Sequence, residues 1–255
     1  LTAYGSNGIT GLGNETISVS DTGIGSSLDA SDLNSLDSKT SGSVTTDAGL
    51  VTLTGSVSAL NTAYGSGGLT IDGDEAITIT GSAVTVAAAD LNLLNSYTSG
   101  NINADNVAKI TGSVADLNTA FGAKSASSNG ISFSSSAGAA DQAVEITDAT
   151  VLAVDLKTLN SNTTGQVDAS TLSEIEGTAA DANLIYDEKD SATGFTGLGD
   201  EAITLTDTTV TAAALIDLYS SDGTSGIIDA STVHTITGTT ANAVSYTHLT
   251  LPTKS

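Results

Sequence analysis

Internal repetition constrains the fold of this 255-residue chain more than any other feature. One block begins with Gly and then Ser or Thr, and continues with an alanine- and leucine-rich stretch. Its copies lie at 55–66, 112–123, 177–188 and, as the start of a fourth copy, 238–243. Successive copies begin 57, 65 and 61 residues apart. This spacing predicts about four units of roughly 60 residues that fill residues 1–243 as a single repeat array.

Each unit is built from two related halves. A second block, typified by GLGDEAITLTDT, supplies the other half, and its copies lie at 11–22, 71–82, 197–208 and, in degenerate form, 143–150. Residues 77–95 and 102–121 share the same order of a short strand-like stretch, a turn and a helix-like segment that contains DLN. A half of about 30 residues cannot bury its apolar face alone, whereas stacked halves can.

The periodicity of the apolar residues identifies the elements within each half. The run ITIT at 77–80 alternates with period two, which predicts a strand with isoleucines on one face and threonines on the other. Val114, Leu117 and Phe121 follow the period of a short helix. Ser113 and Asp116 have the spacing of a capping box, as do Thr178 and Asp181 in the next copy. The TSG turns that follow helices, at 40–42, 98–100 and 224–226, are expected to place Gly at positive φ.

These elements predict an α/β repeat solenoid, with stacked short parallel strands and short helices on one side. The alternative is a string of separate α+β domains of about 60 residues. The absence of a proline-rich linker favours the continuous stack, because the only proline is Pro252. The serine-rich stretch at 125–140 accounts for the longest repeat interval and is expected to be a loop insertion.

Both ends of the chain have unusual sequences. Residues 1–6, LTAYGS, nearly repeat the LNTAYGS at 60–66, so we expect the chain to begin within a repeat. Residues 244–255, VSYTHLTLPTKS, resemble a translated sequencing adaptor of the kind found on metagenomic fragments. We therefore expect this segment to be a non-native tail and exclude it from the functional argument.

The composition excludes several functional classes. The chain has 29 acidic residues, six lysines, no arginine and a formal charge of −23, which argues against nucleic acid or an anionic membrane as a partner. No apolar run approaches the roughly 18 residues that would suggest membrane insertion. Cysteine is absent, and His234 is the only histidine outside the tail. It lies in a strand-like stretch and is expected to be exposed, so we predict no catalytic residues and no enzyme.

The acidic residues recur at equivalent positions and have two interpretations. One set comes just before the helical stripe, where a carboxylate stabilises the helix N-terminus: Asp32, Asp90, Asp116, Asp155 and Asp181. Another set lies in glycine turns that could hold Ca²⁺ through oxygen ligands: Asp72, Asp74, Glu75, Asp200 and Glu201. The alternative is that these are solvated polar turns and that the protein has no cofactor. Neither the EF-hand nor the glycine-rich nonapeptide pattern is present.

Asparagine also recurs within the helix-like segments. These residues would form a side-chain ladder along the stack or would be solvated: Asn34, Asn61, Asn92, Asn118 and Asn183.

The blocks at 8–22, 165–186, 197–208 and 225–243 are similar to the tandem arrays of giant extracellular and cell-surface proteins of marine bacteria, especially cyanobacteria. The resemblance covers essentially the whole chain outside the tail. It implies a secreted or surface-attached repeat region with a structural or adhesive role, and it carries over no catalytic residues.

Three functional hypotheses follow. The leading one is a spacer or adhesive segment of a large surface protein, whose partners are neighbouring repeats of the same parent chain and an extracellular glycan or cell surface. The second is a glycan- or ice-binding module with exposed threonine faces formed by Thr78, Thr80, Thr204 and Thr206. The third is a carbohydrate-active enzyme on a β-helix-like scaffold, which would require two close carboxylates that do not recur in the repeats.

Overall fold

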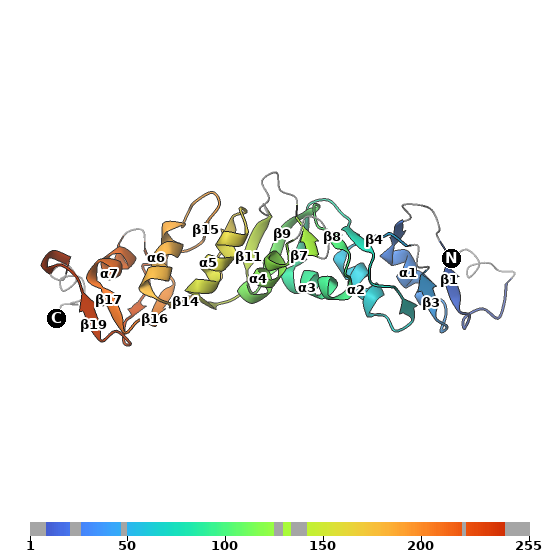
Figure 1. Ribbon diagram of the computed structural model, residues 1–255, viewed down its shortest axis with the longest axis horizontal. Coiled ribbons are helices and arrows are strands. Elements are labelled where there is room, and N and C mark those ends of the chain that lie inside the picture. Colours follow the sequence, from blue (N-terminus) through green and yellow to red (C-terminus); the bar gives the residue numbers. More distant parts are fainter. Residues whose placement is uncertain are drawn as a thin grey trace. The chain divides into compact units, whose positions relative to one another are not determined.

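The computed structural model describes residues 9–20, 27–46, 50–124, 130–133, 142–220 and 223–242. It is an α/β structure with several parallel sheets and short helices, as predicted (Figure 1). The chain divides into two compact units, one of Leu1–Ile110 with Thr119–Ala137 and one of Thr111–Asn118 with Gly138–Ser255. The tail expected at 244–255 lies outside the described residues.

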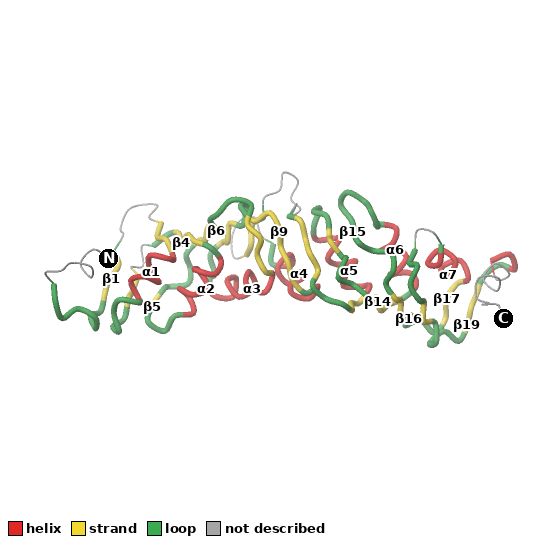
Figure 2. Tube along the Cα trace, turned by 180° about the vertical axis from the view of Figure 1, so that it is seen from behind, coloured by secondary structure: helices red, strands yellow, loops and turns green. Residues whose placement is uncertain are grey.

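Helices form where the sequence has the apolar stripe and a preceding cap. Those of the first unit are α1 (Ala30–Asp37), α2 (Val57–Gly65) and α3 (Ala88–Tyr97). Those of the second unit are α5 (Ala153–Asn162), α6 (Ala179–Asp187) and α7 (Ala212–Tyr219), and the boundary between the units falls within α4 (Val114–Gly122). Figure 2 shows α1, α2 and α3 following one another in a row beside the strands of their unit.

Parallel strands of the first unit form two sheets. One has the order β1 (Ile17–Val19), β3 (Val44–Thr46) and β5 (Leu69–Thr70). The other has the order β2 (Ser27–Asp29), β4 (Thr52–Gly55), β6 (Ala76–Ile79), β8 (Asn101–Asn103) and β10 (Gly130–Ser132). Strand β7 (Val84–Ala87) lies beside β9 (Val107–Gly112).

The second unit repeats this arrangement. Strands β11 (Ala143–Ile146), β13 (Val167–Asp168) and β15 (Phe195–Thr196) pair in parallel. A four-stranded sheet has the order β12 (Thr150–Leu152), β14 (Glu174–Gly177), β16 (Ala202–Leu205) and β18 (Ile228–Asp229). The last pair is β17 (Thr209–Thr211) with β19 (Thr235–Thr237).

The core of each unit consists of aliphatic side chains that face one another along the sheets. In the first unit, Leu53, Ile77, Ile102 and Ile131 lie in register on neighbouring strands and are completely buried. The helices bury Ala and Leu at the positions that the 3.6-residue period predicts, such as Leu60 in α2. Alternation therefore selects the inward face of each strand, and the helical stripe selects the covering face of each helix.

Two expectations from the sequence were wrong. The stretch at 125–140 was expected to be a loop, but residues 130–132 within it form β10, which pairs with β8; 125–129 and 134–140 lie outside the described residues. The glycines of the TSG turns, Gly42, Gly100 and Gly226, do not have positive φ. A Cβ at Gly100 would lie 2.1 Å from the carbonyl oxygen of Glu75, so close backbone approach requires glycine there.

Candidate functional site

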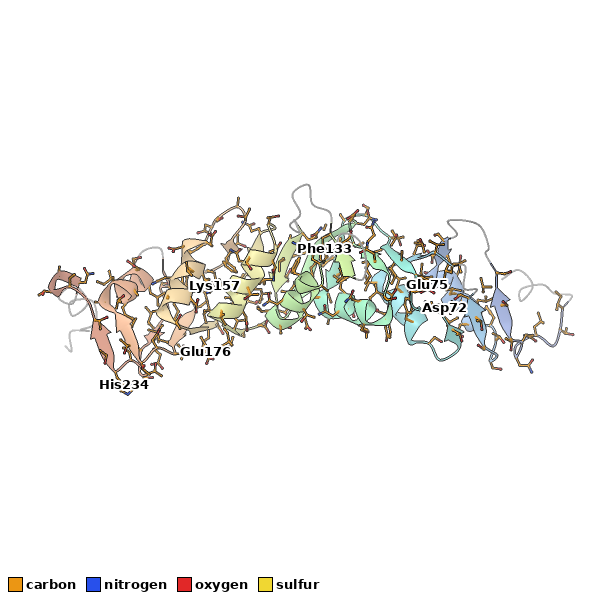
Figure 3. All side chains as sticks on the ribbon, viewed as in Figure 1. Asp72, Glu75, Phe133, Lys157, Glu176 and His234 are labelled. Atoms are coloured by element: carbon orange, nitrogen blue, oxygen red, sulfur yellow. The ribbon has the colours of Figure 1, made fainter. Side chains whose placement is uncertain are left out.

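The acidic turns place their carboxylates in two different environments. Glu75 and Glu201 are 2% and 1% exposed, whereas Asp72, Asp74 and Asp200 are exposed. Asp72 and Glu75 are labelled in Figure 3. Among the described residues, no three or more Asp, Glu, His or Cys side chains are grouped as a metal ion would require. The calcium site therefore remains a prediction. In the structure, the Glu75 and Glu201 carboxylates accept hydrogen bonds from groups of the chain itself.

The Glu75 carboxylate joins its own turn to the preceding helix. It accepts hydrogen bonds from the backbone N–H groups of Asp72 (3.1 Å) and Gly73 (3.0 Å), and from the hydroxyl of Tyr64 at the end of α2 (3.1 Å). The backbone carbonyl of Glu75 accepts a hydrogen bond from Thr98 Oγ1 (2.9 Å), just after α3. We call this set, Tyr64, Glu75 and Thr98, a glutamate clasp. It fastens one turn to the ends of two successive helices.

The second unit contains the same clasp in Tyr186, Glu201 and Thr224. Tyr186 donates its hydroxyl to Glu201 Oε2 at 2.8 Å, and Gly199 N–H donates to the same carboxylate at 2.9 Å. Thr224 Oγ1 donates to the Glu201 carbonyl at 2.5 Å. The same contacts therefore recur at these two buried glutamates, one in each unit.

Each clasp keeps its tyrosine protonated. Burial raises the pKa of Tyr64 well above its ordinary value, and the adjacent Glu75 carboxylate raises it further. The pKa of Tyr186 is raised in the same way, first by burial and then by the hydrogen bond to Glu201. A neutral hydroxyl is thus retained as the donor to the carboxylate, because a phenolate there would be buried beside a like charge.

Two other copies of the block show which parts of the clasp are kept and which parts change together. Glu15 repeats part of the clasp, since it accepts Gly13 N–H at 2.7 Å and its carbonyl accepts Thr40 Oγ1 at 2.7 Å. In the copy where Phe121 replaces the tyrosine, Gln142 replaces the glutamate. An aromatic ring without a hydroxyl is thus accompanied by a neutral amide. This co-substitution was the sequence signal that could have revealed the clasp, and the sequence analysis missed it.

Asparagines at one repeat position connect four of the helices to the helix that follows. Their Nδ2 groups donate to backbone carbonyls in the first turn of the following helix at 2.9–3.1 Å: Asn34 to Ala59, Asn61 to Asp90, Asn118 to Asp155 and Asn183 to Ala214. These four residues are therefore not simply solvated, but their amides bond to backbone carbonyls rather than to each other, which is not the side-chain ladder considered from the sequence. We call them asparagine brackets.

Lys157 occupies the bracket position of α5 and makes a different connection to the next helix. Its ammonium forms an ion pair with Asp181 in the first turn of α6. The hydrogen bond from Lys157 lowers the pKa of Asp181, with a further contribution from Thr178. The pair is partly exposed, so it contributes little beyond the connection itself.

The acids expected at helix N-termini are found there. Asp32, Asp90, Asp116, Asp155 and Asp181 all lie in the first turn of a helix. The predicted capping spacing also holds, because Asp116 N–H bonds to Ser113 Oγ (3.1 Å) and Asp181 N–H to Thr178 Oγ1 (3.1 Å). In both cases the hydroxyl donates back to the aspartate carboxylate.

Two further aspartates, which the sequence analysis missed, cap helices from a distance. Asp148 accepts Val114 N–H and Asp207 accepts Ala179 N–H, each at 2.7 Å. Asp148 also lines a 310 Å³ groove at the start of α4, and a related 230 Å³ groove lies at the start of α2 in the first unit. Asp148 and Asp155 in the first groove and Asp90 in the second lie at helix N-termini, at positions that recur in the repeats. Glu176 on β14 also lines the first groove and does not cap a helix.

The predicted threonine faces point away from the core but are not uniform. Thr78 lies opposite Thr54 and Asn103, and Thr204 lies opposite Glu176 and Asp229. Thr80 and Thr206 are exposed beyond the strand ends. His234 is exposed beside β19, as predicted (Figure 3).

Comparison of the chain with family models, curated proteins and solved structures finds no match. Within the described residues, no helix combines the length and apolar character needed to cross a bilayer.

Proposed function

We propose that this chain is a structural repeat segment, with a spacer or adhesive role, of a large secreted or cell-surface bacterial protein, and that it has no catalytic activity. We further propose that its coils stack as an α/β solenoid. The observation that carries the proposal is the asparagine bracket, which joins α1 to α2, α2 to α3, α4 to α5 and α6 to α7 at the same repeat position. Nearest-neighbour contacts of this kind are typical of solenoids, whose partners are their own adjacent repeats.

The contacts of four acidic side chains support the same conclusion. Glu75 and Glu201 close turns, while Asp148 and Asp207 cap helices. These carboxylates are engaged in equivalent contacts at successive repeats. A scaffold needs such repetition, whereas a catalytic site needs a particular pair of groups in one place.

Small-angle X-ray scattering of the full chain tests the stacking. A compact globule of this length would have a radius of gyration of about 18 Å, and a stack of coils would be clearly larger. A value near that of the globule would contradict the solenoid. Binding of the labelled chain to a glycan array then separates the two roles, because an adhesive segment binds and a plain spacer does not.

A second candidate function is glycan or ice binding through exposed threonines. Thr209 and Thr211 on β17 lie opposite Thr235 and Thr237 on β19, and all four are exposed. An ice-recrystallisation assay and the glycan array would compare Thr235→Val with Thr85→Val, an exposed strand threonine outside this set. This candidate requires that only the first substitution lowers binding.

A further inference from the structure

The groove at the start of α4 differs in chemistry from its copy in the first unit. We call it the α4–α5 groove, and all of its lining residues belong to the second unit. Its larger aliphatic and its acidic lining residues are Val114, Val151, Leu152, Asp148, Asp155 and Glu176. The copy in the first unit, the α2–α3 groove, has Asp90 as the one acidic residue of its lining.

The difference arises at a pair of residues that departs from the repeat pattern. Leu152 on β12 lies opposite Glu176 on β14, and Leu152 is 46% exposed. The pairs at the equivalent place on β2 and β4 and on β17 and β19 are Asp29 with Thr54 and Thr211 with Thr237. Neither combines an aliphatic side chain with a carboxylate. Contacts that hold the repeats together recur from copy to copy, whereas this exposed combination does not, so it is not explained by the packing of the repeats.

The charge of the α4–α5 groove is not balanced by the chain itself. Within the part of the chain that the structure describes, the Asp155 and Glu176 carboxylates form no ion pair, and no lysine lines the groove. Asp148 accepts the Val114 N–H at 2.7 Å but meets no cationic side chain there. The formal charge of −23 strengthens this negative potential, which attracts cations and repels nucleic acid and anionic membranes. A bare cation would leave Leu152 exposed to water, so the complementary ligand is both cationic and apolar.

We propose that the α4–α5 groove binds a basic peptide segment of a partner protein, in which a lysine or arginine lies next to an aliphatic residue. The cationic group would meet the Asp155 and Glu176 carboxylates (Glu176 is labelled in Figure 3), and the aliphatic side chain would cover Leu152. The alkyl stems of lysine and arginine also cover apolar surface while their charged ends reach polar groups. At 310 Å³ the groove is near the lower limit of about 300 Å³ for ligand sites, which suits a short segment. The inference goes beyond the proposed function and does not depend on coil stacking, because one unit supplies the whole groove.

Fluorescence anisotropy of a labelled peptide with the full chain tests the ligand chemistry. The probe is the capped peptide GLKVKG, and the matched peptides are GSKSKG, which lacks the aliphatic side chains, and GLEVEG, which reverses the charge. We expect GLKVKG to bind at least several-fold more tightly than either matched peptide. Equal binding of GLKVKG and GSKSKG would show a general attraction of cations to an acidic chain and would overturn the proposal, as would a lack of binding.

Two substitutions that restore the repeat pattern test the site. Glu176→Thr introduces the residue found on β4 and β19, and Leu152→Ala introduces the residue that precedes α3, so both variants should fold, which far-UV circular dichroism checks. We expect each to weaken GLKVKG binding by about three-fold. The controls Asp187→Asn and Leu184→Ala alter exposed residues of α6 outside the groove and should leave the affinity unchanged. Equal effects of Glu176→Thr and Asp187→Asn would overturn the proposal.

Backbone amide shifts of the ¹⁵N-labelled full chain locate the bound peptide. Addition of GLKVKG should shift the amides of Leu152, Asp155 and Glu176 and leave those of Ala87 and Asp90, in the α2–α3 groove, unchanged. Shifts of equal size in the two grooves would overturn the proposal. A radius of gyration near that of a globule would contradict the stacking and leave these shifts unaffected, so the two proposals can fail separately.

Discussion

The glutamate clasp makes a quantitative prediction about coupled substitutions. Tyr64→Phe removes the hydroxyl that donates to Glu75 and leaves a carboxylate that is only 2% exposed with fewer donors. A hydrogen bond to a charged group contributes about 1.5–3 kcal/mol, so we expect a loss of that order in the free energy of unfolding. Glu75→Gln removes the charge and should lower the free energy of unfolding by a similar amount. The NH2 group of the new amide is a donor, and it would face the two backbone N–H donors that now bind the carboxylate.

The double variant Tyr64→Phe/Glu75→Gln should cost less than the sum of the single variants by about 1 kcal/mol or more. The chain contains this combination itself, as Phe121 with Gln142. With a neutral amide at position 75, removal of the Tyr64 hydroxyl no longer leaves a buried charge without that donor. The coupling between the two positions is therefore the energetic signature of the clasp.

Urea unfolding followed by far-UV circular dichroism measures all four states of this cycle. Tyr219→Phe is the control, because that ring is 53% exposed and lies outside the clasp. Tyr186→Phe and Glu201→Gln repeat the cycle in the second unit, where the hydroxyl–carboxylate distance is 2.8 Å. Additive costs, within about 0.5 kcal/mol in both units, would refute the idea that the hydroxyl and the carboxylate act as a pair.

Two contacts, one pH effect and one metal-ion effect give further predictions. Gly177→Ala should cost about 1–3 kcal/mol, because its Cβ would lie 2.6 Å from that of Ala153, while Gly122→Ala, with no atom nearby, should not destabilise. Asn34→Ala should lose about 0.5–1.5 kcal/mol through its bracket, against almost nothing for the exposed Ser35→Ala, in the same urea assay. Folding raises the pKa of both clasp tyrosines, so their contribution to the free energy of unfolding should be fully present below about pH 10 and should decrease above it. The melting temperature should therefore fall between pH 8 and 11, and it should fall less in the variant Tyr64→Phe/Tyr186→Phe. A chelator should leave the melting temperature unchanged, since the buried turn carboxylates are held by internal donors, and a large rise with added Ca²⁺ would contradict this.

Local patterns in the sequence were sufficient to predict the elements. Alternation at 77–80 and the stripe at Val114 and Leu117 depend only on which face of a strand or helix is buried, and both are confirmed. Cap residues such as Ser113 act within one turn, so their spacing is also visible in the sequence. The parallel pairing follows from the strand–helix–strand order.

The clasp could not be predicted from such local patterns, because its parts are far apart in the sequence. Tyr64 and Glu75 are separated by a turn and a strand, and Thr98 lies beyond another helix. Only the fold brings them together, and the turn by itself resembles an acidic ion-binding loop. Comparing the copies would have been more informative than reading one, because the tyrosine and the glutamate change together.

Repeated polar contacts accompany the aliphatic rows between neighbouring helices and turns, and they help to explain how so acidic a chain can still have a specific fold. Each half of about 30 residues contributes few large side chains, and the isoleucine rows alone would permit neighbouring strands to shift by two residues. A bracket such as Asn61 to Asp90, or a clasp such as Tyr186 to Glu201, is formed in only one register. The aliphatic rows therefore provide most of the burial, and the repeated amides and carboxylates determine which strand positions lie opposite each other. A variant that lacks the brackets should consequently lose uniqueness of register before it loses its secondary structure.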